Sequence, residues 1–199
     1  HLHAERHRAV GDGAADAGAA AHALTDRVVE ALGRNPRLVL GLPTGRTPVA
    51  FYHELASRVE RGEADLSQAT TFMNVHFFGR VNLAAERIHF LNGVAIDTVE
   101  ECDRYEREIA AVGGIDILIL GLGTNGHIGF NEPAPALPAR THRVTLAPGA
   151  RRGNAELFGG DPAAVPPEAL SMGIATILQA RQVILVATGQ AKATVVERL

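Results

Sequence analysis

The chain has 199 residues, of which 46% are hydrophobic, and a net charge of −3. This size suits a single α/β domain with a sizeable core, no apolar run reaches the ~18 residues of a membrane span, and no charged-then-apolar leader opens the chain. The net negative charge argues against a surface that binds nucleic acid through overall positive charge. The single cysteine, Cys102, excludes an internal disulfide. We therefore expect a cytoplasmic protein without nucleic-acid or membrane partners.

In the first half of the chain, hydrophobic periodicity predicts alternating helices and strands. An alanine-rich helix over residues 13–33 precedes a buried strand over 37–42, and Pro48 lies in the first turn of a helix that runs to about Arg61. The pattern then indicates a short strand at 69–72, the end of a helix at 73–79 and a helix at 104–112.

The second half continues this alternation. It predicts strands at 115–120, 142–146 and 182–188, a helix around 166–179, a loop over 134–139 and a final helix that carries Lys192. Strands that alternate with helices indicate a doubly wound, mostly parallel sheet with helices on both faces, a Rossmann-like three-layer sandwich. We expect residues 1–199 to form one such domain.

A glycine-rich segment, GLGTNGHIGFNEP at 121–133, follows the buried strand at 115–120. It presents Asn125, His127 and Glu132 where ligands bind in open α/β sheets, at the carboxyl end of a strand. A histidine and a carboxylate there can transfer protons, and glycines let the backbone approach a small substrate. The alternative is a turn histidine with a helix-capping carboxylate.

Two further segments have the chemistry of a phosphate site. Thr44, Gly45, Arg46 and Thr47 lie between a strand and a helix amino terminus, where exposed amides and hydroxyls can bind phosphate, although an ordinary helix cap is the alternative. The only lysine, Lys192, also follows a strand and a turn; it could complete such a site or be simply solvated. No group of histidines has convincing metal-ligand spacing, so we expect no metal.

Taken together, these segments resemble the glucosamine-6-phosphate deaminase family, within the glucosamine-6-phosphate isomerase and 6-phosphogluconolactonase superfamily. The matching segments run in family order and comprise 41–48, 91–93, 121–133, 140–141, 165–166 and 188–193. The lactonases lack the Phe-Asn-Glu-Pro that stands here at 130–133, which favours the deaminases. The resemblance implies a cofactor-free enzyme that converts glucosamine 6-phosphate and water to fructose 6-phosphate and ammonia.

The resemblance also implies roles for single residues. His127, supported by Glu132, would assist opening of the sugar ring, and Asn125 occupies a position that is Asp in some members and Asn in others. Gly121 would contact substrate. The phosphate would be bound by Thr44, Gly45, Arg46, Thr47 and Lys192.

Three departures from the family pattern stand out. An Asn-x-Asp-Glu-Tyr segment, whose Asp is the proton-transferring base, is expected after Phe72, but the chain continues directly into Met73 and a helix end, as if a segment were skipped. Glu156 stands where an Arg often contacts phosphate, a charge that Arg46 could replace. The family also usually continues beyond Leu199.

Two other functions stay open at this point. One is a lactonase or another phosphosugar isomerase of the same fold, and the other is a non-catalytic regulator that binds a sugar phosphate without a base. In each case the partner is a small phosphosugar. A homo-oligomer is also possible, since monomers, trimers and hexamers occur in the family.

Overall fold

The computed structural model describes residues 17–45, 48–72 and 78–198, and it alternates strands with helices along most of that length. The α-helices are α1 (Ala17–Arg34), α2 (Val49–Glu60), α3 (Thr98–Ala111), α4 (Pro148–Asn154), α5 (Ile174–Leu178) and α6 (Ala193–Val196). The strands are β1 (Val39–Gly41), β2 (Thr70–Phe72), β3 (Ile88–His89), β4 (Ile117–Gly121), β5 (His142–Thr145), β6 (Glu168–Ser171) and β7 (Gln182–Val186). Short 3-10 turns are η1 (Phe78–Arg80), η2 (Ala85–Arg87), η3 (Ala155–Phe158) and η4 (Gln190–Lys192).

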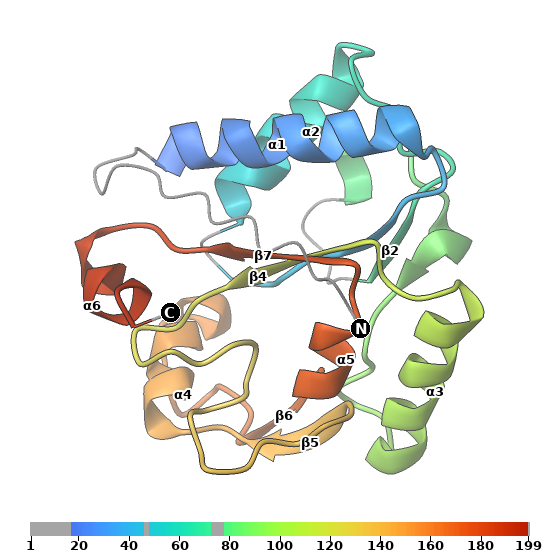
Figure 1. The fold of residues 1–199 in the computed structure, drawn as a ribbon. Helices are drawn as coiled ribbons and strands as arrows, with labels where there is room; N and C mark the ends of the chain where they lie inside the picture. The colour runs from blue at the N-terminus through green and yellow to red at the C-terminus, as the bar shows by residue number, and fades with distance from the viewer. Residues whose placement is uncertain (1–16, 46–47, 73–77, 199) are drawn as a thin grey trace.

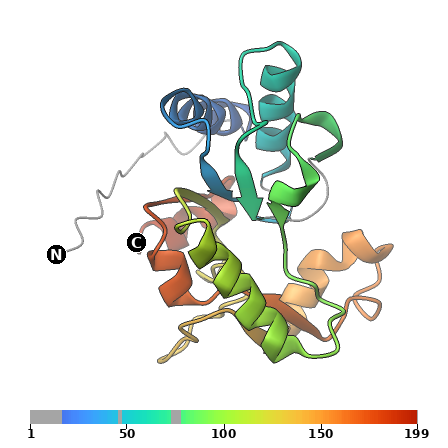
Figure 2. The same cartoon turned by 90° about the vertical axis from the view of Figure 1, so that its right-hand side faces the viewer.

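Five strands form a wholly parallel sheet in the order β3-β2-β1-β4-β7. Helices α1 and α2 cover one face of it, and α3 and α5 cover the other, so three layers result (Figure 1). The view turned by 90° keeps α1 and α2 above the sheet and α3 below it (Figure 2). The predicted doubly wound α/β fold is therefore confirmed.

Each face of the sheet has its own hydrophobic core. Leu24, Val28 and Leu32 recur every four residues along α1 and pack with Phe51 and Leu55 of α2 over one face. On the opposite face, α3 and α5 pack against side chains of β1 and β4, and the buried residues there are Val39, Tyr105, Ile109, Ile115, Leu118, Leu120 and Ile177. Two-sided burial explains why β4 is one continuous apolar run.

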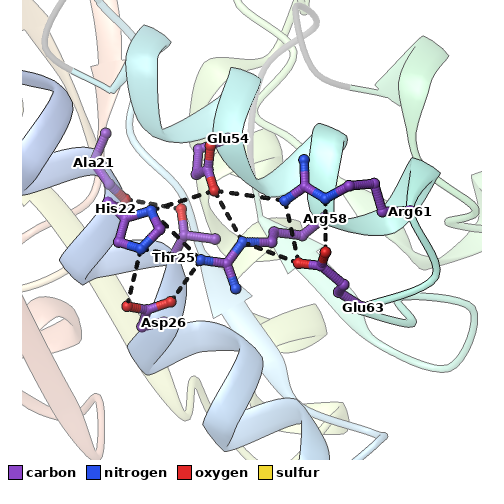
Figure 3. Close-up of polar contacts among 8 residues, drawn as sticks. All are labelled: Ala21, His22, Thr25, Asp26, Glu54, Arg58, Arg61 and Glu63. Atoms are coloured by element: carbon purple, nitrogen blue, oxygen red, sulfur yellow. Dashed lines mark hydrogen bonds and ion pairs between the residues drawn. The ribbon is translucent and has the colours of Figure 1, made fainter.

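An ion-pair cluster joins α1 to α2 (Figure 3). The Arg58 guanidinium on α2 lies 2.7 Å from Asp26 of α1, 2.9 Å from Glu54 and 3.3 Å from Glu63. Hydrogen bonds with Arg58 lower the pKa of Glu54, although some desolvation opposes this. His22 of α1 lies 3.5 Å from Glu54, so the cluster ties the two helices together at the surface.

A second, two-stranded antiparallel sheet corrects two of the sequence predictions. The strand expected at 142–146 is present as β5, but it pairs with β6 rather than with the parallel sheet. The helix expected around 166–179 is wrong, because residues 168–171 form β6 and only 174–178 are helical. Pairing with β5, remote in sequence, overrides the local pattern.

Other boundaries differ less. Helix α3 begins at Thr98 rather than 104, because the Asp97 side chain accepts hydrogen bonds from the amides of Val99 and Glu100 and so caps the helix. Lys192 ends the 3-10 turn η4, just before α6, instead of lying within a long helix. The helix end expected at 73–79 falls mostly on residues outside the described ones.

Two parallel strands, β2 and β3, are joined by residues 73–87. The described part of this connection contains the 3-10 turns η1 and η2 without an α-helix. Parallel neighbours usually need a crossover of a dozen or more residues that includes a helix.

Among the described residues, no helix is long and apolar enough to cross a membrane.

Candidate active site

The predicted site segments follow three adjacent strands of the parallel sheet. The segment 42–48 follows β1, the glycine-rich segment follows β4, and residues 187–192 follow β7. Strand order reverses between β1 and β4, since β2 and β3 lie on one side of β1 and β4 and β7 on the other. A topological switch point of this kind is the usual ligand site of an open α/β sheet.

The glycine-rich segment folds back on itself at the end of β4. The amide of Gly123 donates to the carbonyl of His127 at 2.8 Å, and the Gly126 amide donates to the Gly123 carbonyl at 3.1 Å. Gly126 has φ +93°, a conformation that a side chain would strain. The tight turn brings the His127 ring over the backbone of Gly123.

Asn125 links His127 to Glu132. Its amide nitrogen Nδ2 donates to Glu132 Oε2 at 2.6 Å, and its Oδ1 lies 2.7 Å from His127 Nδ1. Because a carboxylate only accepts hydrogen bonds, Nδ2 must face Glu132, and Oδ1, which also accepts from the His127 amide at 3.2 Å, faces the imidazole. A hydrogen bond from the imidazole to Oδ1 requires a proton on Nδ1, which in the neutral ring leaves the lone pair on Nε2. The structure thus brings the three predicted residues together. The sequence predicted that Glu132 supports His127, and the structure shows that Asn125 connects the two.

The candidate phosphate loop lies between β1 and the start of α2. Thr44 and Gly45 are exposed, and Gly45 has φ +102°. The helix cap, Pro48, makes no side-chain capping bond, and the first amides of a helix have no partner within the helix itself. Arg46 and Thr47, also expected in this site, lie outside the described residues.

Lys192 ends η4, and the helix that follows it, α6, approaches the glycine-rich segment: a methyl group built at Gly126 would lie 3.3 Å from Val195 Cγ2. Partial burial lowers the pKa of the Lys192 ammonium below its usual value. Gly121 pairs with Val186 at the end of β7, which joins the two loops through the sheet.

Ser171 and Asn131 are two residues near the site to which sequence reasoning gave no role. Asn131, which follows Phe130 in sequence, is buried. Its Nδ2 donates to the carbonyls of Ile128 and Met172 at 3.0 and 2.9 Å. Ser171 Oγ accepts from the Phe130 amide at 3.1 Å. The sequence signal for Ser171 was weak, since it lies 40 residues from its partner Asn131.

The remaining candidate groups have ordinary structural positions. Glu156 lies exposed on η3, Cys102 is buried in α3, where desolvation raises the pKa of its thiol, and His89 pairs with Glu108 at 3.0 Å. Within residues 17–45, 48–72 and 78–198, no three His, Cys, Asp or Glu side chains are grouped to hold a metal ion.

Comparison with known proteins identifies the family. The family described as glucosamine-6-phosphate isomerases/6-phosphogluconolactonase matches residues 65–199. The chain belongs to this family. Glucosamine-6-phosphate deaminase 1 of Giardia intestinalis is 43% identical over 189 aligned positions, which cover 85% of this chain and 71% of that protein.

Solved structures of the family agree with this placement. A monomeric glucosamine-6-phosphate deaminase has a TM-score of 0.87 and 33% identity, covering 92% of this chain and 84% of that one. The 6-phosphogluconolactonase of Thermotoga maritima has a TM-score of 0.67 at 15% identity, covering 95% of this chain and 86% of its own. The likeness to the lactonase shows a shared fold alone, whereas the deaminases are similar in sequence as well.

Proposed function

We propose that the chain is a cytoplasmic glucosamine-6-phosphate deaminase that converts glucosamine 6-phosphate and water to fructose 6-phosphate and ammonia. The hydrogen-bonded chain from Glu132 through Asn125 to His127 carries the proposal, because it leaves a defined imidazole nitrogen for proton transfer. The similarity to curated deaminases supports the substrate, and the unpaired Cys102 supports the compartment.

Ring opening is the step that this chain of residues can perform. The C1–O5 bond of the sugar breaks while a proton leaves the O1 hydroxyl and another reaches O5. His127 Nε2 accepts the first proton and, as an imidazolium, can return a proton to O5. The Glu132 carboxylate, acting through Asn125, keeps the His127 imidazole oriented and stabilises the positive charge of the imidazolium. All of this is acid–base chemistry of the chain's own residues, and the proposal uses no cofactor.

The substrate phosphate would bind at the start of α2. Thr44, Gly45, Arg46 and Thr47 would offer amides and hydroxyls, with the helix dipole favouring the anion. Lys192 would add a point charge from the neighbouring loop. This phosphate site is supported by the position of the two loops. They follow the carboxyl ends of β1 and β7, which lie on either side of β4 in the sheet.

Moving a proton between C2 and C1, before ammonia leaves, requires a further base. In the family this base is the Asp of the segment expected after Phe72. We propose that a segment with this base is missing from the connection between β2 and β3, because the described part of that connection contains no α-helix. The same observation favours a second candidate, a protein that binds and opens the phosphosugar without deaminating it. Homo-oligomer formation stays a prediction.

Binding and turnover measured on the same preparation separate these functions. Calorimetric titration with glucosamine 6-phosphate should show binding that Lys192→Ala weakens, and incubation should release ammonia. Binding without ammonia would establish the second candidate. Hydrolysis of 6-phosphogluconolactone in place of ammonia release would instead show a lactonase.

A further inference from the structure

The turn that carries the acid–base pair is hydrogen-bonded to the end of the small antiparallel sheet. Residues 128–131 form a closed turn, in which the Asn131 amide donates to the Ile128 carbonyl at 3.1 Å. His127 stands immediately before this turn and Glu132 immediately after it. The position of the turn therefore fixes how the two catalytic side chains face one another.

Ser171, the last residue of β6, is one attachment point, beside the Met172 carbonyl, which accepts from Asn131 Nδ2 at 2.9 Å. Ser171 Oγ accepts from the Phe130 amide at 3.1 Å and from Asn131 Nδ2 at 3.4 Å. It also packs against Gly129, where φ is +60° and a methyl group would lie 3.0 Å from the hydroxyl oxygen. Both Ser171 and Asn131 are only 5% exposed, so water does not replace these contacts easily.

The sheet that presents Ser171 is itself held to the main body of the protein. Ser171 pairs with His142 in β5, directly after Thr141. Thr141 donates through its amide and its hydroxyl to Glu106 of α3 at 2.7 and 2.6 Å, and Thr176 donates to the same carboxylate oxygen at 2.6 Å. Side-chain hydrogen bonds and the pairing of β5 with β6 thus connect α3 to the turn.

We propose that Ser171 is a positioning residue of the active site, which aligns Glu132 and Asn125 with His127 without touching substrate. This inference rests on the proposed function for its catalytic consequence. Loss of the hydroxyl would leave the Phe130 amide without its partner and let the turn shift. The bond from Asn125 to Glu132 would then lengthen, and Asn125 could no longer hold the His127 proton on Nδ1.

Nitrogen NMR of the His127 ring tests the inference independently of turnover. The wild type should show a single Nδ1–H tautomer, and Ser171→Ala should show a mixture of tautomers. Asn131→Asp, which keeps the shape of the side chain but replaces its donor, should do the same from the turn side. Thr145→Ala, at the far end of the same small sheet, removes an exposed hydroxyl and should retain the wild-type spectrum.

Kinetics gives the second readout. We expect kcat of Ser171→Ala to fall about tenfold, with KM within about twofold of wild type, because the phosphate loop is untouched. Ser171→Ala and Asn131→Asp proteins that fold, keep the pure tautomer and retain wild-type kcat would overturn the inference. So would a Ser171→Ala chain that fails to fold while Thr145→Ala folds, since Ser171 would then serve the fold and not the site. An inactive wild type with the expected tautomer change would contradict the deaminase function alone.

Discussion

The imidazole of His127 lies directly against the α-carbon of Gly123. A methyl group built at Gly123 would lie 2.2 Å from His127 Nδ1 and 2.3 Å from Cε1, far inside contact distance. Nδ1 is the same atom that meets Asn125 Oδ1. Any side chain at position 123 must therefore push the ring away from its hydrogen-bond partner.

From this contact we expect Gly123→Ala to lower kcat by about 10- to 100-fold, because displacing a catalytic group by about 1 Å has an effect of that order. Steady-state kinetics measures it. Gly33→Ala makes the same chemical change in α1, where nothing lies within 4 Å, and should keep wild-type kcat. Equal activity in the two variants would show that His127 does not need its observed position.

Tyr52 gives a contrasting prediction for substrate affinity. Tyr52 lies in α2, and its hydroxyl donates to the carbonyl of Pro43. This hydrogen bond ties the start of the candidate phosphate loop to the helix that follows it. Burial raises the pKa of the phenol, which keeps it a donor across the working pH range. Tyr52→Phe should raise KM about 2- to 10-fold, the effect of one hydrogen bond, with little change in kcat. A lowered kcat at unchanged KM would contradict this role.

Thr71 offers a test of stability in the core. Its hydroxyl is fully buried and has no hydrogen-bond partner among the described residues. Thr71→Val should therefore stabilise the fold by about 1 kcal/mol, or about 2–4 °C in Tm for a protein of this size. Thr25 is the matched control, because it is equally buried but donates to the Ala21 carbonyl at 2.8 Å. If Thr25→Val stabilises as much as Thr71→Val, the missing partner is not the cause.

Glu101 predicts how stability depends on pH. Hydrogen bonds from Arg104 lower the pKa of this buried carboxyl below its ordinary value of 4.5, and the Asn92 amide contributes in the same direction. A depressed folded-state pKa means that the stabilisation is present above the unfolded value and is lost as pH falls toward the folded one.

Glu101→Gln should accordingly lower Tm at pH 7, and its deficit should shrink as pH falls below 4.5. Thermal unfolding measured from pH 7 to pH 3 checks this. Glu30→Gln, in an exposed pair with Arg34, should show only a small deficit at any pH. A Glu101→Gln deficit that is constant with pH would mean that the charge is not the stabilising feature.

Local sequence signals predicted the parallel sheet and the place of the glycine-rich segment well. The buried run that ends at Gly121 and the Pro48 turn have patterns that depend on neighbours in sequence. The stretch around 166–179 could not be predicted in the same way, because β6 exists only through its pairing with β5. Apolar spacing in that stretch is compatible with a helix, and only the distant partner decides.

The candidate site divides along the same line. Asn125, His127 and Glu132 lie within eight positions, so their meeting could be expected from sequence. The tautomer of His127 could not, because it depends on which atoms of Asn125 face its two neighbours. The support from Ser171 and Tyr52 was equally hidden, since a serine in a strand and a tyrosine in a helix have no local signature of such contacts.

Ammonia and fructose 6-phosphate, assayed together after incubation of this chain with glucosamine 6-phosphate, test the central claim most directly. The account predicts that the two products appear in equal amounts, and that His127→Gln lowers the rate by about 100-fold or more. Absence of both products from a folded wild type that binds the substrate would contradict it, and would leave a phosphosugar-binding protein in place of an enzyme.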